Sequence, residues 1–151
     1  MEVSSKGVAL IKEFESFRAA PYLCAAGVPT IGWGSTRYPD GRAVKLSDPK
    51  ITKAVGDMYL HHDLSIFERA VNRALIVPVS QCQFDACVSL CYNVGQGNFA
   101  ASTLVKMVNA GNTPEAVAPQ FLRWDKAKGR SLAGLTRRRT TEMALFLTST
   151  A

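Results

Sequence analysis

The 151-residue sequence contains no long apolar run. Because a membrane-spanning helix needs about 20 mostly apolar residues in succession, we predict no membrane span. The first residues, Met1-Glu2-Val3-Ser4-Ser5-Lys6, also lack the basic segment and the apolar stretch of a secretory signal. We therefore expect a protein made in the cytoplasm, although removal of an export segment from a longer chain would leave the same beginning.

Histidine and cysteine are scarce, and their spacing argues against a metal site. The two histidines, His61 and His62, are adjacent. The four cysteines form no CxxC pair and no zinc-like Cys/His cluster: Cys24, Cys82, Cys87 and Cys91. We predict no metal and no organic cofactor. Cys87 and Cys91 stand four residues apart on a predicted helix, which favours core packing over a disulfide or redox role.

Acidic residues are fewer than basic ones, 12 Asp and Glu against 18 Lys and Arg, which gives a formal net charge of +6. This charge favours polyanionic partners such as nucleic acid, acidic lipid or the bacterial envelope, or it simply keeps the surface soluble. Internal repeats, low-complexity segments and long linkers are also missing. We predict one domain over residues 1–151, with an ordinary globular composition.

Apolar periodicity and turn signals predict an α+β fold. Glycines, β-favouring residues and a turn at Pro39-Asp40-Gly41 place a small antiparallel sheet in a lobe at about 20–46. Ser47-Asp48-Pro49 and the capping box Ser80-Gln81-Cys82-Gln83 mark two helix starts. Helices are predicted at residues 6–18, 47–72, 80–94, 102–110, 114–123 and 135–147. A sheet-bearing lobe beside a larger helical lobe is expected to leave a cleft, where ligand sites tend to lie.

Two acidic residues, Glu13 and Glu15, flank the apolar stripe of the first helix, and periodicity alone does not choose between them or distinguish either from a surface residue. Glu15, however, is followed after eight residues by Cys24 and after five more by Thr30. The next residues are Ile31-Gly32-Trp33-Gly34. This arrangement resembles the phage lysozyme family, glycoside hydrolase family 24, whose active-site pattern is Glu, eight residues, Asp or Cys, five residues, Thr.

Downstream motifs extend the resemblance over roughly residues 7–147. They are Gln83-Phe84-Asp85-Ala86, Tyr92-Asn93-Val94-Gly95, Ser102-Thr103-Leu104, Asn109-Ala110-Gly111 and Gly134-Leu135-Thr136-Arg137-Arg138-Arg139. The family implies a lysozyme-like fold and hydrolysis of the β-1,4 bond between N-acetylmuramic acid and N-acetylglucosamine in peptidoglycan. T-even relatives have a histidine where this chain has Ser35, so an ion pair built on that histidine is absent, with an expected effect on stability.

The resemblance makes Glu15 the general acid, and Cys24 and Thr30 the residues that position or activate water. Protonating a poor leaving group requires a carboxyl that keeps its proton near neutral pH, and shielding by Phe14 and Trp33 would help Glu15 to do so. Cys24 departs from the carboxylate of many relatives, because a thiol accepts hydrogen bonds poorly until it ionises. It could be a thiolate base, a nucleophile, a polar spacer or a buried small residue.

Substrate contacts are expected from aromatic residues and from one arginine beside the catalytic glutamate. The arginine is Arg137 or Arg138 by resemblance, with an exposed basic face as the alternative. Core packing is at least as good an explanation for two of the aromatic residues, Tyr92 and Phe99. The candidates for substrate binding are Tyr22, Trp33, Tyr92, Asn93, Phe99, Arg137 and Arg138.

By resemblance, the partner is the peptidoglycan glycan strand, and a holin releases a monomeric enzyme from the host cytoplasm to the periplasmic wall. A lytic transglycosylase, which forms 1,6-anhydro products, and a non-catalytic peptidoglycan-binding module remain alternatives. A nucleic-acid binder ranks last, because the chain has one basic cluster and no recognisable binding motif.

Overall fold

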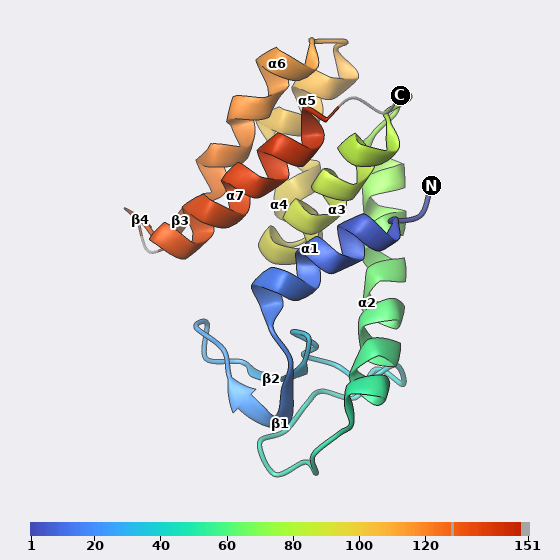
Figure 1. Cartoon of the computed structure of the whole chain (residues 1–151), viewed down its shortest axis with the longest axis vertical. Helices are drawn as coiled ribbons and strands as arrows, with labels where there is room; N and C mark the ends of the chain where they lie inside the picture. The colour runs from blue at the N-terminus through green and yellow to red at the C-terminus, as the bar shows by residue number, and fades with distance from the viewer. Residues whose placement is uncertain (128, 149–151) are drawn as a thin grey trace. The chain divides into compact units, whose positions relative to one another are not determined.

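The computed structural model describes residues 1–127 and 129–148. Helices and short strands follow one another along the chain as Figure 1 labels them. The elements are α1 (Ser5–Glu15), β1 (Arg18–Leu23), β2 (Pro29–Gly32), α2 (Lys53–Ala74), α3 (Gln81–Val94), α4 (Gln96–Ala100), α5 (Thr103–Asn109), α6 (Pro114–Val117), the 3-10 helix η1 (Ala118–Trp124), β3 (Lys126–Ala127), β4 (Arg130–Ser131) and α7 (Ala133–Phe146). The predicted α+β class is confirmed.

The chain divides into two compact units. We call Ala9–Ile66 the sheet unit, and Met1–Val8 together with Phe67–Ala151 the helical unit. Helices α1 and α2 each contribute residues to both units.

A small antiparallel sheet organises the sheet unit. The partners across β1 and β2 are Arg18 with Gly32, Tyr22 with Thr30, and Leu23 with Pro29. The register shifts between Arg18 and Tyr22, where Pro21 has no N–H to donate to the ladder. The adjoining core cluster contains Ile31, Tyr38, Val44, Ile51 and Tyr59.

Helix α3 packs against α7 and α4 in the helical unit. Its residues from Phe84 to Cys91 are all buried. The predicted capping box is confirmed: the Ser80 hydroxyl accepts from the Gln83 amide at 3.1 Å, and the Gln83 side chain accepts from the Ser80 amide at 2.9 Å. Cys87 and Cys91 are fully buried, which confirms that they pack as core residues.

Helix α2 begins later than predicted, at Lys53 and not near Pro49. Asp48 does not cap the helix, because its carboxylate accepts from the Tyr38 hydroxyl at 2.7 Å and from the Lys45 amide at 2.9 Å. Instead the Thr52 hydroxyl accepts from the Val55 amide at 3.2 Å. The Ser47-Asp48-Pro49 signal was therefore wrong: tertiary contacts of Asp48 outweigh its local capping preference.

Two other boundaries differ from the prediction. Helix α1 ends at Glu15 and not at residue 18, because Ser16 adopts a positive φ of 57° and β1 starts at Arg18. The predicted helix at 114–123 is one α-helical turn, α6, continued by the 3-10 helix η1. The short helix α4 and the β3–β4 hairpin were not predicted, because they have too few residues for a periodic pattern to show in the sequence.

Candidate active site

The turn after β1 surrounds the Cys24 thiol with hydrogen-bond donors. The Cys24 amide donates to the Val28 carbonyl and the Gly27 amide donates to the Cys24 carbonyl, at 3.0 and 2.8 Å, so the chain folds back sharply. A hydrogen bond from the Val28 amide lowers the pKa of Cys24 most. The Ala26 amide and the Thr30 side chain lower it further, whereas partial burial raises it. The net direction is down, so this half-buried thiol favours the thiolate more than an ordinary cysteine does.

Thr30 and Tyr22 lie on the same face of the small sheet. They are direct cross-strand partners, and such partners project to the same side. The Thr30 hydroxyl donates to the Val28 carbonyl oxygen at 2.9 Å and also lies within reach of the Cys24 thiol. Thr30 is buried, with 3% of its surface exposed. The face therefore brings together Tyr22, Cys24 and Thr30.

Glu15 is the last residue of α1 and is half-buried. The residue after it, Ser16, adopts the left-handed conformation and donates its amide to the Lys12 carbonyl at 3.0 Å, which closes the helix. The negative charge of Glu15 raises the pKa of Tyr22, after the larger effect of burial. Glu15 thus acts electrostatically on the same face that carries Cys24 and Thr30. Glu13, the other acidic candidate, is exposed.

Trp33 is buried, with 8% of its surface exposed, and its environment is charged. Its indole Nε1 donates to Asp57 Oδ1 at 2.8 Å, and the Lys12 ammonium lies 5.1 Å from the ring centroid. The Lys53 ammonium lies 5.7 Å from the same centroid, and the Phe17 ring is tilted against Trp33 at 5.5 Å. These contacts tie Trp33 to α1 and α2 within the sheet unit.

Ser35 donates its hydroxyl to Asp63 Oδ2 at 2.6 Å. Burial raises the pKa of Asp63, while the Ser35 hydroxyl and the positive charge of His62 lower it. A hydroxyl–carboxyl hydrogen bond thus joins Ser35 to Asp63. The sequence contained no local signal for Asp63, because the partners are 28 residues apart.

Five of the predicted substrate-binding residues belong to the helical unit. Tyr92 is half-buried and stacks edge-on against Phe67, with centroids 5.1 Å apart. Asn93 accepts from Arg139 Nη1 at 3.0 Å. Phe99 is fully buried, which favours the core-packing interpretation of this residue over contact with a saccharide.

The two candidate arginines differ in exposure. Arg138 is only 4% exposed, and its Nε lies 3.3 Å from Glu142 Oε2, while its Nη2 donates to the Ser89 carbonyl at 3.3 Å. Arg137 is exposed. Of the two, Arg137 is therefore the better candidate for contacting a ligand, and Arg138 joins α7 to α3.

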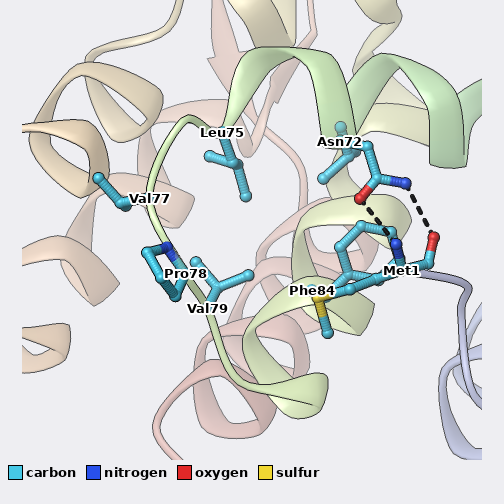
Figure 2. A pocket seen from close by; sticks show the side chains of 8 residues that line it. Met1, Asn72, Leu75, Val77, Pro78, Val79 and Phe84 are labelled. Carbon is cyan, nitrogen blue, oxygen red and sulfur yellow. Dashed lines mark hydrogen bonds between the residues drawn. The ribbon is translucent and has the colours of Figure 1, made fainter.

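A pocket of about 290 Å³ lies in the helical unit (Figure 2). It is lined mainly by apolar residues, among them Val71, Leu75 and Phe84. Its polar groups bond to each other: the Met1 ammonium donates to Asn72 Oδ1 at 3.0 Å, and Asn72 Nδ2 donates to the Met1 carbonyl at 2.8 Å (Figure 2). The pocket contains none of the predicted catalytic residues.

Residues 12–142 match the model of the family described as phage lysozyme. The chain belongs to the phage lysozyme family. It is 40% identical to the endolysin of Salmonella phage P22 over 97% of this chain and 99% of that protein. The endolysin from Escherichia coli O157:H7 phage FAHEc1 matches with a TM-score of 0.88 and 40% identity, over 97% of this chain and 94% of that one. The muramidase domain of SpmX from Asticaccaulis excentricus matches with a TM-score of 0.84 and 34% identity, over 98% and 99%.

Family membership confirms the lysozyme-like fold and shows that the chain is an enzyme of the lysozyme type. In the described residues, no helix is long and apolar enough to cross a membrane. Over the same residues, no three His, Cys, Asp or Glu side chains gather as a metal site would require.

Proposed function

We propose that this phage lysozyme cleaves the β-1,4 bond between N-acetylmuramic acid and N-acetylglucosamine in peptidoglycan, with Glu15 as the general acid. The proposal rests on family membership and on the grouping of Glu15, Cys24 and Thr30 in one compact unit. Glycoside hydrolysis needs a carboxylic acid to protonate the leaving oxygen and a second group to direct water to the anomeric carbon.

The observation that carries the assignment is the set of donors around Cys24. Backbone amides of the turn, chiefly that of Val28, and the Thr30 hydroxyl serve a single side-chain position, and such a turn stabilises an anion. A carboxylate and a thiolate both satisfy it, which explains in physical terms how Cys24 can stand where other family members have Asp. The thiolate would accept a proton from the attacking water, or hold that water by a hydrogen bond.

Thr30 would couple to the ionisation of Cys24. Its single hydroxyl proton can serve only one acceptor at a time, the Val28 carbonyl or the sulfur. When Cys24 is a thiolate, the hydroxyl would turn to the sulfur. Thr30 therefore supports the anion and does not compete for the water's proton.

Tyr22 is the best-supported substrate contact in the sheet unit, because it shares a face with Thr30 and responds to the charge of Glu15. The Arg18 guanidinium lies 4.3 Å from the Tyr22 ring centroid and fixes one side of the ring. Arg137 and Tyr92 remain candidates from the helical unit. Asn93 would serve mainly to hold Arg139.

The direct test measures reducing ends released from purified peptidoglycan by wild type, Glu15→Gln and the neighbouring control Glu13→Gln. We expect Glu15→Gln to lose at least about 100-fold in rate, because the proton donor is gone, and Glu13→Gln to stay close to wild type. A Glu15→Gln enzyme as fast as its parent would refute the role of Glu15.

Mass spectrometry of the same products separates the alternatives. Hydrolysis gives reducing-end sugars, whereas 1,6-anhydro ends would identify a lytic transglycosylase. Binding to peptidoglycan without any product from the wild type would identify a non-catalytic module.

In the phage cycle, the enzyme would act as an endolysin that degrades the host wall at lysis. Its release from the host cytoplasm would depend on a holin, and it would work as a monomer. Lysis timing in cells that express the chain with and without a holin tests the first point. Light scattering after size-exclusion chromatography tests the second.

A further inference from the structure

The peptide segment that carries Glu15 is attached to α2 on both sides of the glutamate. Three residues before Glu15, the Lys12 ammonium lies 3.0 Å from Asp57 Oδ1. Two residues after Glu15, the Phe17 ring packs so closely on Gly56 that a Cβ there would lie 2.6 Å from Phe17 Cε2. Gly56 and Asp57 are consecutive residues of α2, so both attachments reach the same place.

Trp33 joins the two attachments. Its Nε1 donates at 2.8 Å to the same Asp57 oxygen that binds Lys12, and its ring lies 5.5 Å from that of Phe17. The hydrogen bonds from Lys12 and then Trp33 lower the pKa of Asp57, so the carboxylate is charged at neutral pH. All of these residues belong to the sheet unit.

We propose that Lys12, Phe17, Trp33, Gly56 and Asp57 form a bracket that fixes the orientation of the Glu15 carboxyl for proton transfer. These are positioning residues, since each acts through the α1–β1 junction and not on the substrate. The proposal rests on the assignment of Glu15 as the general acid.

Because the Lys12–Asp57 pair is exposed, its effect on the position of Glu15 can be measured apart from its effect on the stability of the fold. The Lys12 and Asp57 side chains are 32% and 48% exposed, and ion pairs this open to solvent contribute little to folding. Proton transfer is far more sensitive, because a misplacement of about 1 Å can reduce the rate by as much as 100-fold. Loss of the Lys12–Asp57 ion pair should therefore lower kcat at nearly unchanged Tm, so Lys12→Met is the variant that separates the two effects.

The first experiment compares Lys12→Met, Asp57→Ala and the control Lys53→Met on soluble peptidoglycan fragments, with kcat, KM and Tm measured for each. Lys53 lies over the same Trp33 ring but belongs to α2 itself, so its removal cuts no link between α1 and α2. We expect kcat to fall about 10-fold in the first two variants, with KM within twofold of wild type. Lys12→Arg should keep kcat close to that of the wild type, because it keeps a cationic donor opposite Asp57.

A second experiment uses Gly56→Ala against Gly134→Ala. The new methyl would push the Phe17 ring away, whereas within the described residues nothing lies within 4 Å of a Cβ at Gly134. Both changes favour the helix intrinsically. Only Gly56→Ala should lower kcat.

Wild-type kcat in Lys12→Met and Asp57→Ala, or an equal loss in Lys53→Met, would overturn the bracket. A raised KM with unchanged kcat would also overturn it. None of these results affects the role of Glu15, which the Glu15→Gln variant tests independently.

Discussion

Cys24 and the cysteines of α3 are the same residue type in opposite surroundings. Amide and hydroxyl donors around Cys24 lower its pKa. Burial and the negative charge of Glu142 raise the pKa of Cys87, and burial raises that of Cys91 to about 12. The amides of α3 are occupied by helical hydrogen bonds, so none remain for a thiolate. The anion site is therefore a property of the turn after β1, and sulfur alone does not create it.

An aspartate placed at position 24 or at position 87 should reveal the difference between the two sites most strongly. Cys87→Asp would bury a carboxylate beside Glu142 without a donor, and we expect a loss of about 4 kcal/mol or more in the free energy of unfolding, or no folding at all. Cys24→Asp should keep a cooperative transition near that of the wild type. Urea denaturation of both variants checks this, and equal destabilisation would contradict the difference between the two sites.

Alkylation should distinguish the cysteines without mutation. The thiolate is the reacting form, and Cys24 combines a lowered pKa with partial exposure, whereas Cys82, Cys87 and Cys91 are buried. With iodoacetamide near pH 7, we expect Cys24 to react at least about 10-fold faster than the others, and activity to fall in step. Peptide mapping by mass spectrometry follows each site. Modification of Cys87 or Cys91 in the folded protein as early as that of Cys24 would contradict the predicted difference in reactivity.

Two carboxylates extend the comparison within the sheet unit. Asp48 accepts the Lys45 amide and the Tyr38 hydroxyl, and its pKa is lowered, whereas burial raises the pKa of Asp63 despite the Ser35 hydroxyl. The folded protein thus binds a proton at Asp63 more tightly than the unfolded chain does. The charged form of Asp63 therefore opposes folding at neutral pH, and this penalty disappears as pH falls through the folded-state pKa.

Asp63→Asn should accordingly raise Tm by a few degrees at most near pH 7, and by less as the pH approaches 4. Asp48→Asn should lower Tm at pH 7 and is the matched control. Differential scanning calorimetry across this range measures both. A rise in the Tm of Asp63→Asn that does not change with pH would show that the charge of the Asp63 carboxyl is not the cause of the lower wild-type Tm.

The smallest effect concerns the ends of two helices. Helix α3 is followed by Gly95, which has a φ of 96°, whereas α1 is followed by Ser16, a non-glycine residue with a φ of 57°. Ser16→Gly should stabilise by no more than about 0.5 kcal/mol, because relief of the left-handed strain is offset by the greater freedom of glycine in the unfolded chain. Ser16→Val should destabilise by about 1 kcal/mol. Chemical denaturation measures both variants. A Ser16→Val variant as stable as the wild type would mean that the backbone at Ser16 is unstrained.

The features predicted well from the sequence are those fixed by neighbouring residues. The Ser80–Gln83 capping box and the core helix with Cys87 and Cys91 are examples. Some features that the sequence does not reveal depend on contacts outside the local segment. Asp48 precedes a proline and so resembles a helix cap, but its carboxylate accepts a hydrogen bond from Tyr38, ten residues away, and does not cap the helix.

The candidate site shows the same division. Glu15, Cys24 and Thr30 were found from a spacing that the family shares, and their roles stay proposals. No local pattern marks Asp57, whose partners Lys12 and Trp33 are 45 and 24 residues away in the chain. Phe99 fits a saccharide surface by residue type alone, and only the folded structure shows that it is buried.

The most direct test compares kcat on purified peptidoglycan at pH 7 for Cys24→Ser, Cys24→Asp and the core control Cys87→Ser. If the turn holds a working anion, Cys24→Ser should lose about 100-fold, because a hydroxyl does not ionise there, while Cys24→Asp should stay within about 10-fold of wild type. Cys87→Ser should keep its kcat wherever it folds. If Cys24→Ser is as fast as Cys87→Ser and the wild type, the Cys24 thiolate has no role in catalysis.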